Sequence, residues 1–333
     1  MNPVLLTRLQ INDQRWNELI ERSEQKIIYG FSWYLDIVCE DWNALVWPSA
    51  DDLQIVMPLP VIKKWSYSVI QQPLFCQYLG LFSRTELTAE QIILFLTTLS
   101  SNFSYISTYS FHPQNYKILQ SELPQFAELK FQKNHTNWLF NNKPFELIRS
   151  KYSKNGRLNL KKAERFNWVL EKSEDILPMI NLFKKYHEHK IEHGVTEKAY
   201  NLLVVLFKKL QEMKCAEVWY VSIKNKIHAG ALFVKKDDMG IYLFNASDEV
   251  GRKGNGRTYL IDQYFKENNE NVVWFDFESP EIESISNFYK SFGGEATPFI
   301  TIQKNELPFP LKQIQRFRKK LLLKTRQYLS AIL

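Results

Sequence analysis

Three glycines and three cations lie between a strand-like segment and a helix-like one in FNASDEVGRKGNGRTYLIDQYF, residues 244–265. Glycine lets the backbone approach a ligand closely, and the first N–H groups of a helix attract anions. Because GxG flanked by cations also occurs in ordinary turns, the stretch predicts either an anion cradle or a turn. The candidate binding residues are Arg252, Lys253, Gly254, Asn255, Gly256 and Arg257.

A second group of residues is suited to proton transfer. Asp276 and Glu278 are two positions apart on a predicted strand over 272–278, so both side chains would point to one face. Tyr289 follows in a predicted helix over 281–291. A carboxylate can act as a base and a phenol as an acid. The structural alternatives are a helix cap or ion pair for either carboxylate, and core packing for the tyrosine.

A third pattern is HEHKIEH, in which His189, Glu192 and His193 spell HxxEH, a zinc-protease signature. Glu267 or Glu270 could then supply a third metal ligand. The motif is short, and histidine and glutamate are common on solvated helix faces. We therefore predict no metal site and expect these residues on a surface or facing an acceptor.

The elements that would position these residues follow a regular order. Apolar periodicity and turn residues predict β-α-α-β-β-β-α-β-α-β from residue 167 to residue 303. In the first half they predict helices at 13–23, 31–40 and 88–100, and strands at 43–47, 53–64, 103–111 and 137–140. In the second half they predict strands at 167–171, 217–224, 228–235, 239–246, 272–278 and 296–303, and helices at 176–193, 197–213, 256–268 and 281–291.

That order, with a glycine loop leading into a helix, resembles the second half of the GNAT acyltransferase fold. The string NFYKSFG, residues 287–293, is similar to that family's LYEKLGF helix end. YSKNGRLNLKKAER and MPLPVIKKWSYSVIQQPLFCQYLGLF resemble the Fem-type branch. Its members carry two GNAT-like domains and include enzymes that add amino acids from aminoacyl-tRNA to peptidoglycan precursors. The resemblance implies an α/β (α+β) fold of tandem GNAT-like domains, with mixed central sheets flanked by helices.

The resemblance also divides the chain. We expect an altered GNAT-like domain over 1–143, a basic bridge over 144–166, and a GNAT-like domain carrying the donor loop over 167–305. Residues 306–333 would form a basic amphipathic helix.

The resemblance further assigns roles in the site. Its loop holds the pyrophosphate of coenzyme A, and Gly254 and Gly256 match its glycines, whereas Gly251 stands where Gln or Arg is expected. Tyr289 takes the position of the family's acid, with Asp276 or Glu278 as base. The implied backbone donors to the donor carbonyl, on a fourth strand that diverges from the fifth, are Phe244, Asn245 and Ala246.

The implied enzyme is a GNAT-type acyltransferase with no permanently bound cofactor. Acyl-CoA would be the co-substrate, with aminoacyl-tRNA as the alternative donor. The acceptor would be an amine: an amino sugar, an amino acid or a cell-wall precursor. The alternative function is a non-catalytic GNAT-like protein that binds an anionic partner, either RNA or a lipid-linked precursor.

Composition sets further limits. The formal charge of +7 equals the seven cations of the tail over 311–333, which carries no acid. That tail either docks on the body or contacts a membrane surface or RNA, and the basic bridge either meets tRNA or a phosphorylated acceptor or is solvated. Three separated cysteines indicate neither a disulfide framework nor a thiolate zinc site. With no long apolar run and no signal-like N-terminus, we expect a cytoplasmic protein.

Overall fold

The computed structural model describes residues 2–64, 67–140, 143–191, 194–268, 272–278 and 282–315. These residues form two compact units, one of residues 2–134 and 298–315 and the other of residues 135–297. The chain passes between the units inside two strands, β7 (Lys130–Phe140) and β13 (Glu295–Asn305). The units therefore differ from the expected domains, because residues 298–305 belong to the first unit and the expected bridge over 144–166 lies within the second.

The first unit is built on a mixed sheet. Its strand order is β1-β2-β3-β4-β6-β13, with β5 paired to β3. β4 and β6 run parallel, and the other strand pairs described in this unit are antiparallel. The central strand β3 reads LQIVMPLPVIKK and is buried over most of its length, as expected for a strand covered on both faces. The bounds are β1 Val4–Thr7, β2 Asp41–Pro48, β3 Leu53–Lys64, β4 Tyr67–Gln71, β5 Phe82–Ser83 and β6 Tyr105–Ser110.

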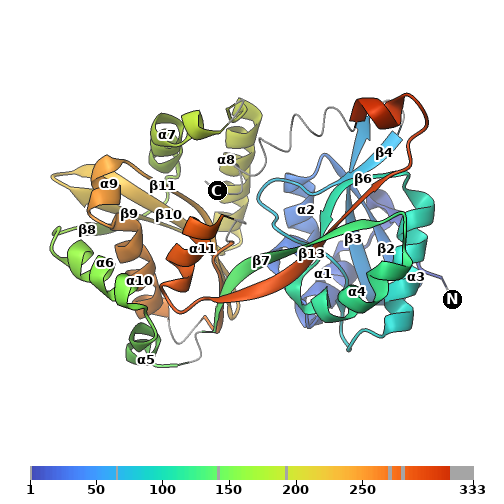
Figure 1. Ribbon diagram of the computed structural model, residues 1–333, viewed down its shortest axis with the longest axis horizontal. Helices are drawn as coiled ribbons and strands as arrows, with labels where there is room; N and C mark the ends of the chain where they lie inside the picture. Colours follow the sequence, from blue (N-terminus) through green and yellow to red (C-terminus); the bar gives the residue numbers. More distant parts are fainter. Residues whose placement is uncertain are drawn as a thin grey trace. The chain divides into compact units, whose positions relative to one another are not determined.

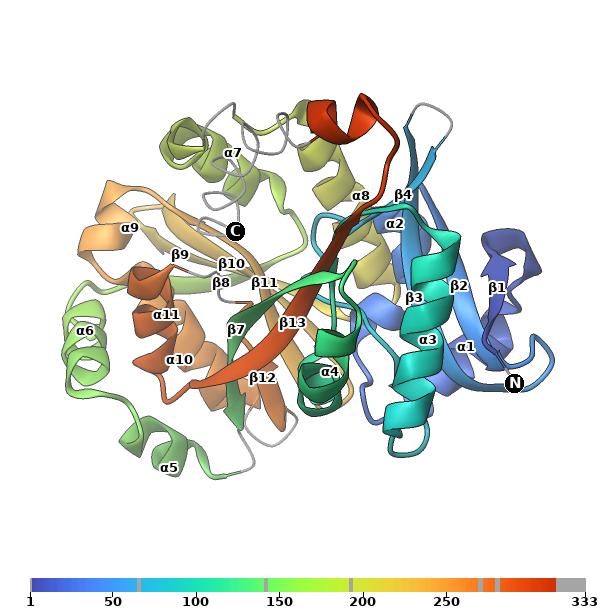
Figure 2. The same ribbon diagram turned by 45° about the vertical axis from the view of Figure 1, so that its right-hand side comes forward.

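Four helices cover this sheet. The side chain of Asn12 caps α1, and Thr88 with Gln91 forms a capping box at the start of α3. The helix α1 packs on β3 and β5, and α3 packs on β2 and on α4 (Figure 2). The bounds are α1 Asp13–Arg22, α2 Ser32–Val38, α3 Ala89–Asn102 and α4 Tyr116–Glu122.

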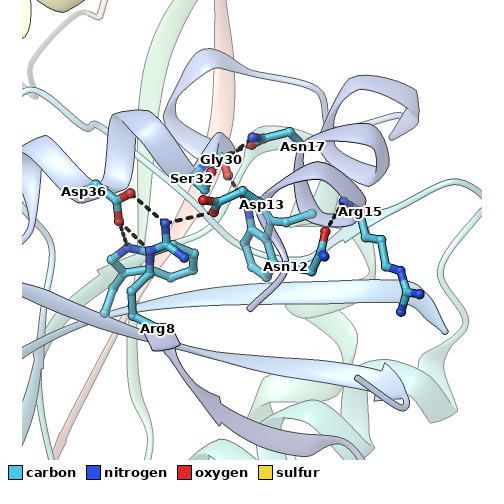
Figure 3. A network of polar contacts seen from close by, with 10 residues as sticks. Arg8, Asn12, Asp13, Arg15, Asn17, Gly30, Ser32 and Asp36 are labelled. Atoms are coloured by element: carbon cyan, nitrogen blue, oxygen red, sulfur yellow. Dashed lines mark hydrogen bonds and ion pairs between the residues drawn. The ribbon is translucent and has the colours of Figure 1, made fainter. Parts of the chain in front are cut away.

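A polar network ties the first elements of this unit together (Figure 3). Arg8, directly after β1, donates two hydrogen bonds to the Asp36 carboxylate of α2, at 2.6 and 2.8 Å. Its guanidinium also contacts Asp13 of α1 at 2.8 Å and lies 5.2 Å from the centre of the Trp42 ring of β2. The indole of Trp42 donates to Asp36 as well, at 2.8 Å. One carboxylate thus links β1, α2 and β2.

The second unit contains an equally regular sheet. Its order is β7-β12-β11-β10-β9-β8, antiparallel except for the parallel pair β11 and β12. Alternate residues face opposite sides: Trp219 packs against Tyr264 of α10, whereas the hydroxyl of Tyr220 reaches the backbone of Met179 in α7. The bounds are β8 Val169–Ser173, β9 Ala216–Ile223, β10 Lys226–Lys236, β11 Met239–Ser247 and β12 Trp274–Asp276.

Helices lie on both faces of this sheet. On one face α7 packs on β10 and β11, and α8 on β9; on the other, α10 packs on β9 and β10 and is covered by α6 (Figure 1). The expected bridge is thus two packed helices, α5 and α6. The bounds are α5 Phe145–Ser150, α6 Lys154–Glu164, α7 Leu177–Tyr186, α8 Glu197–Glu212, α9 Glu249–Lys253, α10 Gly256–Asn268 and α11 Glu283–Lys290.

Two expectations fall largely outside the described residues. The basic helix predicted over 306–333 is described only as far as residue 315, where residues 311–315 are helical and residues 306–310 are not. Glu192 and His193 of the HxxEH pattern are also outside them, as is Glu270. Within the described part of the chain, no helix is both long and apolar enough to cross a membrane.

Replacing Asp36 with asparagine is expected to lower the free energy of unfolding at pH 7 by about 1 kcal/mol. This is below the usual range for charged hydrogen bonds, because the carboxylate is 41% exposed. Burial alone would raise the pKa of Asp36, but the hydrogen bonds from Arg8 and Trp42 lower it below its ordinary value. The stabilisation is therefore complete above the unfolded-state pKa of about 4 and is lost as pH falls through the folded-state value.

Urea denaturation of the wild type and the variant, at pH 7 and at about pH 2.5, measures this difference, which should shrink at the lower pH. Asp13→Asn is the matched control. Asp13 contacts the same guanidinium but is 56% exposed, so its loss should be smaller. Equal stability of Asp36→Asn and wild type at pH 7 would contradict the prediction.

Candidate functional site

The strand β11 loses its neighbour on one side partway along its length. β12 pairs with β11 only from Met239 to Ile241, while β10 pairs along the whole of β11. A β-bulge leaves Leu243 without a partner in the register between β10 and β11. The expected donors Phe244, Asn245 and Ala246 all lie beyond the last β12 contact. Each is no more than 3% exposed.

This divergence leaves backbone groups available. Alternate residues of a strand direct their N–H and C=O groups to one side, and beyond Ile241 no described strand pairs with β11 on the β12 side. An extended ligand bearing a carbonyl can take the place of the missing strand there. The bulge at Leu243 re-aims the backbone at the same point.

The glycine loop after β11 contains a short helix, α9, whose N-terminus is already capped. Asp248 caps the short helix α9, and its Oδ1 accepts a hydrogen bond from the N–H of Gly251 at 2.8 Å. Its Oδ2 lies 2.8 Å from Nδ1 of the buried His228. The anion-attracting end of α9 is therefore already occupied by a carboxylate. The start of α10, at Gly256 and Arg257, is the helix end left for an external anion.

The three loop glycines are each explained by internal packing. A Cβ on Gly251 would lie 2.2 Å from the carbonyl oxygen of His228. A Cβ on Gly254 would lie 2.3 Å from the Trp168 ring, whose Nε1 donates to the Gly254 carbonyl at 3.0 Å. A Cβ on Gly256 would lie 3.0 Å from Val221. Since packing alone requires small residues here, the glycine pattern does not favour coenzyme A over another phosphate-bearing donor.

Cations collect beside the open edge of β11. Arg257 Nη1 donates to the side-chain oxygen of Asn245, and Arg252 Nη1 donates to the carbonyl of Ser247, both at 3.0 Å. Burial, with the charges of Arg252 and Arg257, lowers the pKa of Lys190. Three positive charges that disfavour one another are arranged to receive an anion.

His187 completes this cluster, with its Nε2 within 3.1 Å of the backbone N–H of Ser247. Burial is the main reason that its pKa falls to about 4, and the neighbouring cations lower it further. It is therefore a neutral imidazole at pH 7. Neither His187 nor Lys190 was among the predicted binding residues, because only tertiary packing brings η5 (Glu188–Lys190) and its neighbour to β11.

The remaining predicted loop residues have different positions. Lys253 is exposed and has no ion pair within the described ranges. Asn255 connects α9 to α10 with a positive φ of 52°, a conformation that asparagine tolerates.

The two predicted carboxylates do not lie on one strand. Asp276 ends β12 and is fully buried, and its Oδ1 accepts hydrogen bonds from the Thr136 hydroxyl at 2.6 Å and the Glu278 N–H at 2.8 Å. Glu278 lies beyond the strand with a positive φ of 46°. Because β12 ends at Asp276, earlier than predicted, the alternation of a strand does not extend to Glu278 and no longer supports the expectation that both side chains point the same way. Asp276 supports the local backbone.

Glu278 is the carboxyl suited to act as a base. Its side chain is half-buried, and burial raises its pKa to about 8. Tyr289 stacks on Phe277, with ring centres 4.8 Å apart, and is 2% exposed. Burial raises the pKa of Tyr289 to about 12, with Arg257 opposing and the charges of Glu278 and Asp276 adding to the effect. The phenol is therefore protonated at neutral pH and lies in the electrostatic range of Arg257 and Glu278.

The zinc interpretation gains no support. Among the described residues, no group of three or more histidine, cysteine and acidic side chains is placed to hold a metal ion. His189 is exposed, and Glu267 contacts Lys172.

Comparison with known proteins identifies the fold. No family model matches the sequence, and no curated protein sequence matches it. The solved structure of FemX matches with a TM-score of 0.67 at 12% identity, covering 91% of this chain and 98% of that one. The C-terminal domain of a putative lysylphosphatidylglycerol synthetase from Agrobacterium fabrum matches with a TM-score of 0.52 at 12% identity, over 92% and 97%.

A tandem GNAT protein from the clavulanic acid biosynthesis pathway matches with a TM-score of 0.50 at 8% identity, covering 92% of this chain and 99% of that one. At such identities the likeness concerns the fold alone. The chain has a Fem-like fold with two GNAT-like domains, and the predicted fold class is confirmed.

Alanine variants of the loop glycines should destabilise the protein in the absence of any ligand. Gly251→Ala meets a backbone oxygen that cannot move aside, so we expect a loss of about 3 kcal/mol. Gly256→Ala, with contacts at 3.0 and 3.1 Å, is the matched control and should cost less than about 1 kcal/mol. Urea unfolding of the ligand-free proteins gives both values.

If both variants unfold like the wild type, the glycines serve a ligand and not the fold. A larger replacement at Gly256 is unsuitable as a test of ligand binding, because its Cβ would face Val221 and Ala229.

Proposed function

We propose that the second unit catalyses transfer of an acyl or aminoacyl group from a phosphate-bearing donor directly to an amine. The observation that carries this proposal is the open, bulged edge of β11, with Arg257, Glu278 and Tyr289 beside it. Acyl transfer needs backbone N–H donors at the reacting carbonyl, a base for the amine and an acid for the leaving group. All three lie in this unit.

The reaction follows from these groups. The Glu278 carboxylate removes a proton from the acceptor ammonium, and the amine nitrogen attacks the donor carbonyl carbon. The resulting oxyanion is held by backbone N–H groups of β11 in the stretch Phe244 to Ala246. When the intermediate collapses, the bond to the ester oxygen or thioester sulfur breaks, and the Tyr289 hydroxyl gives that atom its proton. The attacking nitrogen loses its extra proton to solvent and becomes a neutral amide, and proton exchange with water returns Glu278 and Tyr289 to their starting states. No covalent enzyme intermediate is formed.

The donor's phosphates are assigned to the start of α10. Its first N–H groups are unsatisfied within the helix, and Arg257, Arg252 and Lys190 supply positive charge there. Both acyl-CoA and aminoacyl-tRNA carry such phosphates. The packing role of the loop glycines removes the main sequence reason for preferring coenzyme A.

The surface of α6 favours aminoacyl-tRNA, the longer of the two donors. Lys161, Lys162 and Arg165 near its C-terminal end are exposed and have no ion pair within the described ranges. The chain then runs directly to Trp168, which is hydrogen-bonded to Gly254 of the loop. A polyanion bound at the start of α10 can continue along these cations, whereas coenzyme A would not need them. We therefore place aminoacyl-tRNA ahead of acyl-CoA as the donor.

The structurally similar proteins are consistent with this choice. One is named FemX and another is described as a putative lysylphosphatidylglycerol synthetase. A cell-wall or lipid-linked amine is accordingly the acceptor class to test first, with amino sugars and amino acids next.

A pH profile tests the base. With a pKa of about 8, Glu278 is mostly protonated at pH 7, so the transfer rate should rise about tenfold per unit up to that value and then level off. Glu278→Gln should lower the rate by about 10²-fold or more and remove this limb. Single-turnover transfer at constant ionic strength measures both. A Glu278→Gln enzyme with an unchanged profile would exclude the proposed base.

Donor binding tests the phosphate site and separates the two donors. Arg257→Met should lower the binding affinity of the true donor by about tenfold, as expected for loss of a charged hydrogen-bonding group. Lys266→Met, at the other end of α10, is the matched control and should bind like the wild type. Fluorescence titration with coenzyme A and with tRNA gives the affinities.

A triple variant, Lys161→Gln, Lys162→Gln and Arg165→Gln, should weaken tRNA binding and flatten its salt dependence, by about one unit of slope for each phosphate that is no longer neutralised. It should leave coenzyme A binding unchanged. If coenzyme A binds tightly through Arg257 and tRNA does not bind, the donor is acyl-CoA and not aminoacyl-tRNA.

The alternative is a non-catalytic protein that uses the same cations to bind RNA or a lipid-linked anion. It predicts binding that Glu278→Gln and Tyr289→Phe leave unchanged and no transfer with any donor. Transfer that is abolished by Tyr289→Phe while binding persists would exclude it.

A further inference from the structure

A pocket in the first unit has no part in the site described above. It has a volume of about 280 Å³ and lies between the end of α1, the start of α3 and the helix α4. Figure 2 shows α3 and α4 on this unit, and the two helices are in contact. The residues that matter for its chemistry are Glu24, Gln25, Glu86, Ile92 and Lys117.

Two buried amides hold the walls of this pocket in place. Gln25 is 3% exposed, and its Oε1 accepts a hydrogen bond from the N–H of Ser83 at 2.9 Å. Asn115 is 1% exposed and bonds to both the N–H and the carbonyl of Leu81, at 3.0 and 3.2 Å. The pocket is therefore a built feature of the fold and not a gap between mobile side chains.

The Gln25 amide is only half satisfied. Its Nε2 has no hydrogen-bond partner among the residues that the structure describes. This atom is not among the fully buried unpaired atoms of the described residues, so it keeps contact with solvent, and water or a ligand oxygen in the pocket can accept its hydrogen bonds.

Three charged side chains line the same pocket. Glu24, Glu86 and Lys117 are exposed at the pocket, and none has an ion pair within the described ranges. Behind them, Leu87 is 5% exposed and Ile92 is fully buried, so the pocket also has an apolar wall. The sum of these charges is one negative unit, from two carboxylates and one ammonium.

We propose that this pocket binds a basic amino acid, a molecule with two ammonium groups, one carboxylate and a short apolar chain. The ammonium groups pair with Glu24 and Glu86, and the carboxylate pairs with Lys117 and accepts from Gln25 Nε2. The methylene chain lies against Leu87 and Ile92. This ligand neutralises all three charges and satisfies the unpaired amide.

Simpler ligands match fewer of these groups. An anion would be repelled by two carboxylates, and a plain diamine would leave Lys117 and Gln25 unpaired. A neutral-side-chain amino acid would leave one carboxylate unpaired. A metal ion is not supported, since the described residues include no cluster of three or more acidic, histidine or cysteine ligands.

Calorimetric titration of the full chain with three matched probes tests the proposal. L-lysine should bind in roughly the millimolar range, because exposed ion pairs contribute little individually. L-norleucine, which lacks only the second ammonium, should bind about threefold more weakly, and so should 1,5-diaminopentane, which lacks only the carboxylate.

Exposed-residue variants show whether binding occurs in this pocket. Glu24→Gln and Glu86→Gln should each weaken L-lysine binding by about threefold. Lys117→Met should weaken L-lysine binding, because it removes the partner of the ligand's carboxylate. It should not weaken binding of 1,5-diaminopentane, because the lysine ammonium repels that diamine. Lys198→Met, in α8 of the second unit, serves as a control and should bind all three probes as the wild type does.

Three results would overturn the proposal: no binding of L-lysine at tens of millimolar, equal binding of the three probes, or binding that the pocket variants leave unchanged. None of these variants touches the proposed transfer site. Failure of this proposal therefore leaves the transfer assignment unaffected, and the converse also holds.

Discussion

Backbone hydrogen bonding along β11 is the constraint on which the chemistry of the second unit depends. A buried strand must pair its N–H and C=O groups, and β10 satisfies one side of β11 throughout. On the other side β12 stops at the position of Ile241, although the residues beyond it are almost completely buried. A buried edge of this kind is stable with water or with an extended ligand as its partner. The charged residues around it then determine which ligand.

The loop that follows β11 shows how similar sequence patterns can arise from different causes. Glycines near a helix start are often taken to admit a phosphate, yet here each one admits a neighbouring part of the protein. What remains for a ligand is the charge distribution: two arginines and a lysine gathered at one end of α10, with a histidine kept neutral beside them. Recognition in this site is therefore assigned to side chains more than to backbone flexibility.

Much of the fold was predictable because its periodicities are strong. The order of helices and strands from residue 167 onward, apart from the short helices α9 and η5, follows from local patterns. So do the helix at residue 256 and the long strand at residue 53. Element ends were less accurate, and the short strand β12 shows the consequence. The predicted strand reached Glu278 and so placed Asp276 and Glu278 on one face. The observed strand ends at Asp276, which is buried, and Glu278 lies beyond it and is half-buried. The contribution of Lys190 depended on tertiary packing, which a local pattern does not contain.

The two passages of the chain inside β7 and β13 also determine the order in which the protein can be completed during synthesis. The strand β13 pairs with β6 of the first unit, yet it is translated after all the described helices of the second unit. The β6 edge of the first unit therefore remains without this partner until about nine-tenths of the chain has been made. A nascent chain of this design exposes an open sheet edge to its surroundings for most of its translation, so demand for chaperones should arise early, in the N-terminal half.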